Sequence, residues 1–153
     1  MTRLFKQFIF VALLLPISLA SLAQIKVGSK APNFTLSDQN SIQHQLSDYE
    51  GSWGILYFYP KDDTPGCTTQ ACDFRDAVKR IIASKSNVFG VSLDSVESHK
   101  RFADKNNLPF SLLSDESGEV SEAYDSLNNF MSFKSAKRNT FIIDPDGKVA
   151  KIY

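Results

Sequence analysis

The feature that most restricts the fold of this chain is the alternation of apolar and amphipathic segments through its middle. A nearly continuous apolar and aromatic run occupies residues 53–60, and two similar runs with more polar residues occupy 87–94 and 108–115. Runs of this length without a polar face are typical of strands that are buried on both sides. Parallel strands joined by right-handed helical crossovers bury both faces of a sheet. The sequence therefore predicts an α/β fold with parallel strands at the centre of its sheet.

Two amphipathic helices are predicted between these strands. The first begins at Pro65, after Thr64, and runs to about residue 84. Threonine often caps a helix N-terminus, and proline is common in the first turn. Apolar residues in this segment recur at three- and four-residue intervals, as they do on one face of an α-helix. The second helix is predicted to start after a cap at 94–95 and to run to about Asn106.

Shorter elements complete the predicted fold. The first is an extended lead-in with a hairpin that turns at 38–40, and a short helix is expected at 119–125. A closing hairpin is expected to turn at 144–147, where the sequence is Asp-Pro-Asp-Gly. The Phe-rich stretch 130–133 is expected to pack in the core or at its rim.

The N-terminal residues 1–23 are predicted to be a signal peptide, which leaves 24–153 as the folded domain. Arg3 and Lys6 precede an apolar run over 8–20, and small residues stand at the cleavage position. The run is shorter than the ~20 apolar residues that a membrane span needs, so stable membrane insertion is not expected. Export, to the bacterial periplasm, is the expected localisation.

The balance of charge makes one class of partner improbable on physical grounds. The chain has 17 basic and 17 acidic residues, so it carries no net charge that would attract nucleic acid. Nucleic acid is therefore not an expected partner.

Four titratable side chains near the predicted helices and loops are expected to face solvent. They are those of His44, His99, Asp62 and Asp63.

The two cysteines, Cys67 and Cys72, lie five positions apart at the start of the first predicted helix. In a first turn, unpaired N–H groups and the helix dipole favour a thiolate, so Cys67 is expected to be acidic and reactive. Residues five apart on a helix lie about 7.5 Å apart along its axis and about 140° apart around it. A disulfide needs Cα atoms about 4.4–6.8 Å apart, so an intact helix excludes the bond. Either the thiols never pair, or the helix unwinds after Cys67 is oxidised and Cys72 condenses with its sulfenic acid.

Three other uses of the cysteines remain open at this point. A zinc site would need four ligands, and the chain has no further cysteine to supply them. A thiol–disulfide oxidoreductase acting on proteins would normally have two residues between its cysteines. A binding or structural domain would hold the pair in a fixed bridge.

The residues around Cys67 resemble the active-site signature of the peroxiredoxins. The match is Pro60-x-x-x-Thr64-x-x-Cys67, with Cys72 placed as in the bacterioferritin comigratory protein or peroxiredoxin Q subgroup. The resemblance implies that Cys67 is the peroxidatic cysteine, whose thiolate attacks the peroxide O–O bond, and that Cys72 resolves it. It also implies that Thr64 hydrogen-bonds the peroxide, Pro60 shields the thiolate from water, and Arg138 polarises the substrate.

The resemblance covers nearly all of residues 24–153 and implies a thioredoxin-like three-layer sandwich, with a central mixed sheet flanked by helices. The implied activity is the thiol-dependent reduction of hydrogen peroxide and small organic hydroperoxides, without metal, haem or flavin. A thioredoxin-like protein is the implied reductant, and we expect a monomer, with a dimer as the alternative. Members of the family usually continue into a C-terminal helix, which is expected to be missing after Tyr153. Gly66, together with Thr64 and Arg138, is expected to contact the substrate, because glycine allows a close approach to the backbone.

Overall fold

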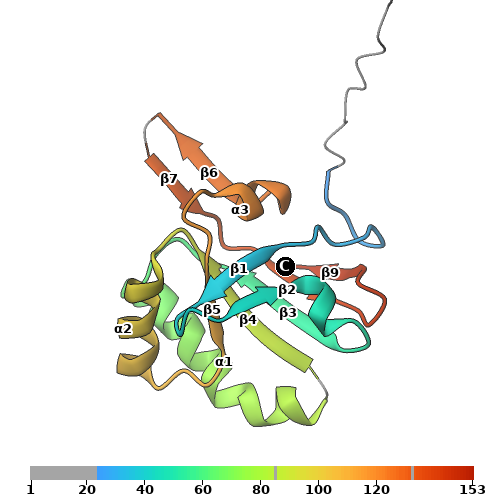
Figure 1. Ribbon diagram of the computed structural model, residues 1–153, viewed down its shortest axis with the longest axis horizontal. Coiled ribbons are helices and arrows are strands. Elements are labelled where there is room, and N and C mark those ends of the chain that lie inside the picture. Colours follow the sequence, from blue (N-terminus) through green and yellow to red (C-terminus); the bar gives the residue numbers. More distant parts are fainter. Residues whose placement is uncertain (1–23, 85, 132) are drawn as a thin grey trace, which may run out of the picture.

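A computed structural model describes residues 24–84, 86–131 and 133–153, and a seven-stranded sheet forms its centre (Figure 1). The strands of this sheet are β1 (Thr35–Asp38), β2 (Gln43–Gln45), β3 (Trp53–Phe58), β4 (Ser86–Ser92), β5 (Ser111–Ser114), β8 (Thr140–Ile143) and β9 (Val149–Ile152). They lie in the order β2-β1-β5-β4-β3-β8-β9, with β3, β4 and β5 parallel to one another. β1, β2, β8 and β9 pair antiparallel with their neighbours. The predicted parallel centre and mixed sheet are confirmed.

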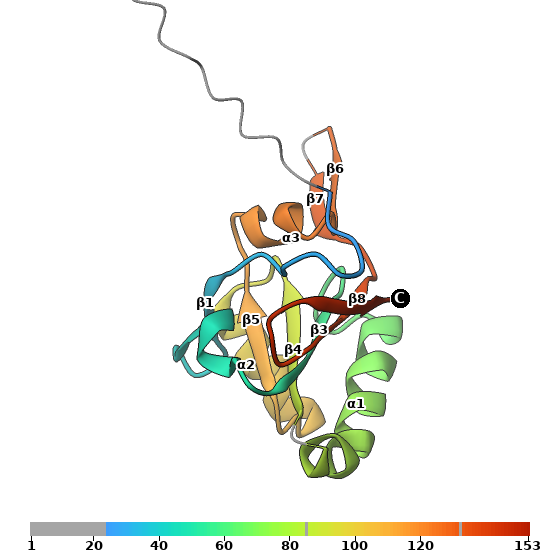
Figure 2. The same cartoon turned by 90° about the vertical axis from the view of Figure 1, so that its right-hand side faces the viewer.

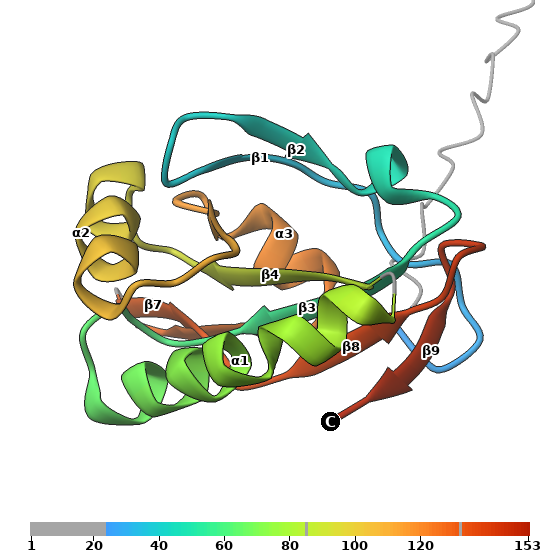
Figure 3. The ribbon, with the colours of Figure 1, turned by 90° about the horizontal axis from the view of Figure 1, so that it is seen from below.

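Helices cover both faces of the sheet. They are α1 (Pro65–Ala83), α2 (Val96–Asn106), α3 (Glu119–Ala123) and the short 3-10 helix η1 (Leu46–Tyr49). In Figure 3, α1 lies in front of β3 and β8, and Figure 2 shows α1 and α3 on opposite sides of the sheet. This is the three-layer, thioredoxin-like arrangement that the sequence predicted.

Strand β3 supplies both hydrophobic cores because its successive side chains point to opposite faces. Leu56 and Phe58 belong to the core on the α3 side, whereas Tyr57 and the following Tyr59 belong to the core under α1 and α2. Cys67 is buried in this second core. The end of β3 and the first turn of α1 therefore contribute to the same core.

Gly90 in β4 makes room for the aromatic ring that joins the sheet to α1. A Cβ at this position would lie 2.7 Å from both Cζ and Oη of Tyr57 and 2.8 Å from Leu112 Cδ2. The Tyr57 ring stacks on Phe74 of α1, with ring centroids 4.6 Å apart. A glycine in the strand thus permits the close packing of the helix that carries both cysteines.

Most of the predicted element boundaries are close to the observed ones. The predicted cap of α2 is confirmed at Ser95, whose hydroxyl accepts a hydrogen bond from the Ser98 N–H at 3.4 Å. The third central strand begins at Ser111, three residues later than its apolar run starts, because Leu108 and Phe110 are buried in the loop that leads into it.

The predicted packing of the Phe-rich stretch is wrong. These residues form a separate two-stranded hairpin, β6 (Leu127–Phe130) and β7 (Phe133–Ala136). Phe130, Met131 and Phe133 are 72%, 88% and 68% exposed. The hairpin projects beyond the sheet in Figures 1 and 2, so its tip has no second layer to pack against.

Candidate active site

Cys67 lies in the first turn of α1, and its side chain is only 1% exposed. The chain reaches this position from β3 through a short loop, residues 59–64. Both cysteines are free thiols. The sulfur of Cys67 is therefore reduced, buried and placed at the helix N-terminus, where backbone N–H groups favour a negative charge.

Arg138 lies between β7 and β8 and contacts the sulfur directly. Its Nη2 donates to Cys67 Sγ at 3.1 Å, and its Nη1 donates to Gln70 Oε1 at 3.1 Å. A Cβ on Gly66 would lie 3.0 Å from the same Nη2, so the glycine leaves the space that the guanidinium occupies. This arrangement can stabilise a thiolate, and it can also stabilise charge that develops on an oxygen bound beside the sulfur.

Thr64 and Pro60 lie in the loop before α1. The Thr64 carbonyl accepts the first helical hydrogen bond, from Thr68 N–H at 2.9 Å. Its hydroxyl donates to the Lys61 carbonyl at 3.0 Å, which turns this hydrogen toward the loop. Pro60 is half-buried two residues after β3 ends. Both predicted residues therefore belong to the loop that leads to Cys67.

Cys72 is half-buried, and α1 is continuous through both cysteines. With the helix wound, their spacing places the two side chains on different faces, about 140° apart. The structure thus corresponds to the reduced state, in which the expected geometry keeps the thiols apart.

The first turns of α1 bury little apolar surface. Pro65, Gly66 and Thr69 are exposed, and only Cys67 and Ala71 are buried between residues 65 and 71. Segments with few buried apolar contacts are the ones that open at low free-energy cost. Local unwinding here would expose Cys67 and Ala71, whereas unwinding further along would also detach the larger, partly buried Phe74 and Ile81.

A buried ionic cluster behind the loop was not foreseen from the sequence. Asp62 is 6% exposed and His99 is 0% exposed, so the prediction that both face solvent is wrong. His99 Nδ1 lies 2.9 Å from Asp62 Oδ2. Burial alone would raise the pKa of Asp62, but hydrogen bonds from His99, Ser98 and Tyr59, with the charge of His99, hold it below its ordinary value.

One sequence signal could have revealed the burial of His99. It lies three and four positions before Phe102 and Ala103, the other two buried residues of α2. That spacing places the three on one face of the helix. The expectation that Asp63 faces solvent is confirmed. Asp63 is exposed, and its Oδ1 pairs with Lys105 Nζ at 2.8 Å.

His44 is also partly buried rather than solvated. Its Nε2 lies 3.0 Å from Asp38 Oδ2, and its Nδ1 contacts the Tyr49 hydroxyl. These residues join β1, β2 and η1 at the edge of the sheet that β2 forms. The cluster is a structural feature of that edge.

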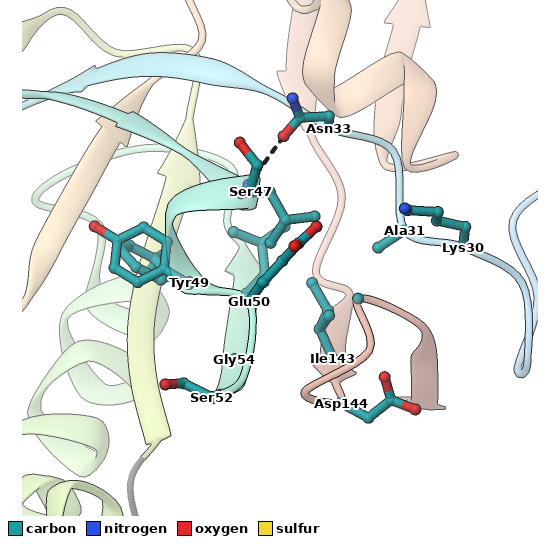
Figure 4. A pocket seen from close by; sticks show the side chains of 14 residues that line it. Lys30, Ala31, Asn33, Ser47, Tyr49, Glu50, Ser52, Gly54, Ile143 and Asp144 are labelled. Atoms are coloured by element: carbon teal, nitrogen blue, oxygen red, sulfur yellow. Dashed lines mark hydrogen bonds between the residues drawn. The ribbon is translucent and has the colours of Figure 1, made fainter.

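A cavity of about 160 Å³ lies on the α3 side of the sheet, on the face opposite Cys67 (Figure 4). It is lined mainly by apolar groups, among them Leu56 and Ile143, and Asn33 at its wall accepts from the Ser47 N–H at 3.3 Å. None of the predicted site residues lines it. In the described ranges we find no group of three or more His, Cys, Asp or Glu side chains arranged to hold a metal ion.

A thioredoxin-like sheet with a buried, reduced cysteine in the first turn of a helix, and with an arginine on its sulfur, defines a thiol-based redox enzyme. The sequence specifies the family. Residues 27–152 match the model of the AhpC/TSA family, and the chain belongs to that family.

Curated relatives narrow the comparison to one branch of the peroxiredoxins. The chain is 44% identical over 131 residues to peroxiredoxin Bcp of Bacillus subtilis, with 83% of each chain covered. It is 42% identical over 131 residues to the chloroplastic peroxiredoxin Q of Sedum lineare, covering 86% of this chain and 70% of the relative. The resemblance inferred from the residues around Cys67 is thereby confirmed.

Solved structures agree with the sequence comparison. The peroxidoxin BcpB of Mycobacterium tuberculosis superposes with a TM-score of 0.81 at 33% identity, over 85% of this chain and 86% of that one. The bacterioferritin comigratory protein of Xanthomonas campestris gives a TM-score of 0.76 at 32% identity, over 84% and 85%. The Xanthomonas structure belongs to work on trapped intermediate and ligand complexes, which concerns the alkyl peroxide reduction activity of that protein.

The expected export to the periplasm is wrong. The relatives that the chain matches are a bacterial peroxiredoxin Bcp and chloroplastic peroxiredoxin Q, and nothing in the comparison points to export. The predicted signal peptide, 1–23, lies outside the described residues. No helix in the described part of the chain combines the length and apolar character needed to cross a bilayer.

Proposed function

We propose that residues 24–153 form the catalytic domain of this peroxiredoxin, in which Cys67 reduces hydrogen peroxide and small organic hydroperoxides and Cys72 resolves the oxidised product. The observation that carries the assignment of Cys67 is the 3.1 Å contact between its Sγ and Arg138 Nη2 at the N-terminus of α1. Cys72 is half-buried, and among the described residues no arginine or lysine donates a hydrogen bond to its sulfur, although the charge of Arg75 lies near it. The two thiols thus have different surroundings, as two different roles require.

In the first step the Cys67 thiolate attacks the outer oxygen of ROOH. A sulfur–oxygen bond forms, the O–O bond breaks, and the departing RO⁻ takes a proton, so that the products are the Cys67 sulfenic acid and ROH. Sulfur is oxidised by two electrons and the peroxide is reduced by two. Arg138 would stabilise the thiolate before attack and the negative charge on the oxygens as the bond breaks.

Three neighbours would position the peroxide. The Thr64 hydroxyl would turn from the Lys61 carbonyl toward the substrate oxygen, a rotation that hydroxyl groups make readily. Gly66 would let the substrate approach the backbone, and half-buried Pro60 would limit the access of water to the thiolate. These roles are supported by the position of all three residues within seven residues of Cys67.

In the second step the Cys72 thiol condenses with the sulfenic acid to give a Cys67–Cys72 disulfide and one water molecule. The wound helix keeps the sulfurs apart, so the first turns of α1 must unwind. The small apolar burial between residues 65 and 71 supports this step. A thioredoxin-type dithiol would then reduce the disulfide, regenerating both thiols and leaving the reductant oxidised.

We further propose that the enzyme works as a monomer. Both cysteines and Arg138 come from one chain, so that no second copy is needed to complete the site or to resolve the sulfenic acid. Light scattering coupled to size exclusion, on the reduced and the oxidised protein, tests this. A stable dimer in both states would contradict it.

Peroxide consumption in the presence of dithiothreitol tests the proposed function. Cys67→Ser should abolish it, whereas Cys72→Ser should complete one turnover and then accumulate sulfenic or over-oxidised Cys67. Undiminished activity of Cys67→Ser would overturn the assignment. Reduction of insulin that depends on the cysteines, without peroxide consumption, would favour an oxidoreductase acting on proteins.

A further inference from the structure

A buried ion pair anchors the loop that carries Pro60 and Thr64. The loop residue between them, Asp62, points away from solvent toward α2. Its carboxylate accepts hydrogen bonds at 2.8 Å from Tyr59 Oη and at 2.8 Å from Ser98 Oγ, and it contacts His99 Nδ1 at 2.9 Å. Its backbone N–H donates to Asp94 Oδ2 at 2.9 Å. One residue, through its side chain and its backbone N–H, therefore fixes the loop to the N-terminal part of α2 and to the segment before it.

The surroundings of His99 determine which of its ring nitrogens carry hydrogen. Nε2 lies 3.2 Å from the Leu113 carbonyl, which can only accept a hydrogen bond. Nδ1 faces the Asp62 carboxylate, whose two oxygens already take hydrogen bonds from two hydroxyl groups. Both ring nitrogens therefore donate, and we assign an imidazolium paired with a carboxylate. Such a pair is costly to break because either partner alone would be a buried, uncompensated charge.

The anchored loop and the first turns of α1 differ in how firmly they are held. Asp62 makes four polar contacts behind the loop. The helix that starts three residues later exposes Pro65, Gly66 and Thr69. A fixed loop thus adjoins a helical segment that can open with little loss of packing.

We infer that Asp62 and His99 are a positioning pair for the peroxide reaction: they hold the loop bearing Pro60 and Thr64 in place and confine the unwinding to residues that follow Thr64. This inference rests on the proposed function. Neither side chain touches the reacting atoms. The pair acts through the loop, which must keep its position while the helix beside it opens and rewinds in each cycle.

A loosened loop should affect some steps of the cycle and not others. Attack on the first peroxide and over-oxidation by a second peroxide both need Thr64 and Pro60 in place, whereas formation of the disulfide needs only the opening of the helix. Loosening the loop should therefore slow both peroxide reactions and leave resolution as fast as before. Misplacement by about 1 Å can cost a reaction about a hundredfold, so losses between about tenfold and a hundredfold are expected.

Two substitutions of His99 form a matched pair. In His99→Gln the amide nitrogen lies as many bonds from Cβ as Nε2 does, so it can still donate to Leu113 but loses Asp62. In His99→Asn the amide nitrogen takes the place of Nδ1 and can still donate to Asp62. We expect His99→Gln to lose at least tenfold in the second-order rate constant of Cys67 with hydrogen peroxide and to over-oxidise less per turnover. His99→Asn keeps the hydrogen bond to Asp62 but not the charge, so it should lose clearly less of the rate than His99→Gln.

The measurements are stopped-flow reaction of the reduced protein with hydrogen peroxide, mass spectrometry of the oxidised products, and urea unfolding of each variant. If both variants lose stability but keep the wild-type rate constant and product ratio, the pair is merely structural and the inference is overturned. Equal loss of rate in both variants would overturn it as well. If His99→Gln does not fold, Ser98→Ala removes one donor to the same carboxylate, and an unchanged rate constant in that variant has the same meaning. Failure of the inference is distinct from failure of the proposed function, because only the latter would leave Cys67→Ser active.

Discussion

Arg138 and Cys67 are 71 positions apart in the sequence, and in the fold the arginine Nη2 donates to the cysteine Sγ at 3.1 Å. The pairing of β8 with β3 explains this proximity. Thr140 lies opposite Tyr57 in that antiparallel pair, so residues just before β8 lie beside residues just after β3. The chain that leaves β3 turns into α1, and the sulfur and the guanidinium meet at that end of the sheet.

Substitution of Arg138 should lower the rate of peroxide attack. Arg138→Met removes the charge and the donor, and we expect the rate constant with hydrogen peroxide to fall by about a hundredfold, the usual cost of one such donor. Arg138→Lys keeps a charge but cannot contact both Cys67 and Gln70, so a loss of about tenfold is expected. Gln70→Ala, as a control, removes only the second anchor of the guanidinium and should cost less than Arg138→Lys. A wild-type rate constant in Arg138→Met would refute the role assigned to Arg138.

Substitution of Gly66 should separate activity from stability. In Gly66→Ala the new Cβ would lie 3.0 Å from Arg138 Nη2 and displace the guanidinium, so we expect the peroxide rate constant to fall several-fold. Alanine favours a helix over glycine by up to about 1 kcal/mol, so the free energy of unfolding should stay the same or rise. Stopped-flow kinetics and urea unfolding measure the two effects. Losses in both quantities would mean that the added methyl group disturbs the fold and not only the arginine.

Two glycines of the sheet should respond differently to the same change. Gly90→Ala places a Cβ 2.7 Å from the Tyr57 ring and should lower the free energy of unfolding by about 1–3 kcal/mol, the usual cost of overpacking. Gly54→Ala is the matched control, because its Cβ would meet only Ile143 Cβ, at an ordinary 3.6 Å. Urea unfolding of both variants tests the difference. Equal losses would show that loss of glycine in a central strand, rather than the contact with Tyr57, sets the cost.

The ion pair of Asp62 and His99 should make stability depend on pH in acid. Because the pKa of Asp62 is lowered in the folded protein, its contribution is fully present above the unfolded pKa of about 3.9 and is lost as pH falls through the folded value. The double variant Asp62→Asn/His99→Asn has no titrating group at the pair, although Tyr59 and Asp94 still face it. We expect the difference in unfolding free energy between wild type and double variant to shrink from pH 5 to pH 3. A difference that is constant over this range would contradict the assigned ion pair.

The order of strands and helices was predictable because it depends on local patterns. The apolar run over 53–58 and the periodic segment from Pro65 are recognisable within one window of sequence, and the cap at Ser95 is a local signal too. The position of Arg138 was expected from a resemblance to known sequences, and the pairing of β8 with β3 explains it physically. The roles of the site residues stay predictions that the experiments above test.

The burial of Asp62 and His99 was missed because it depends on two segments 37 positions apart. A charged residue in a short loop is usually solvated, and here the approach of α2 reverses that tendency. The tip of the hairpin at Phe130 was missed for the opposite reason. Aromatic residues are usually buried, but a two-stranded ribbon that extends past the sheet has nothing above it to cover them.

The reversible unwinding of α1 is tested most directly by mapping the disulfide and the backbone together. Wild-type protein is treated with one equivalent of hydrogen peroxide, digested without reduction and analysed by mass spectrometry, while amide hydrogen exchange is followed over residues 65–72. We predict a crosslink between Cys67 and Cys72 and fast exchange confined to those residues, both reversed by dithiothreitol. Absence of that crosslink, or its presence with exchange as slow as in the reduced protein, would contradict the account.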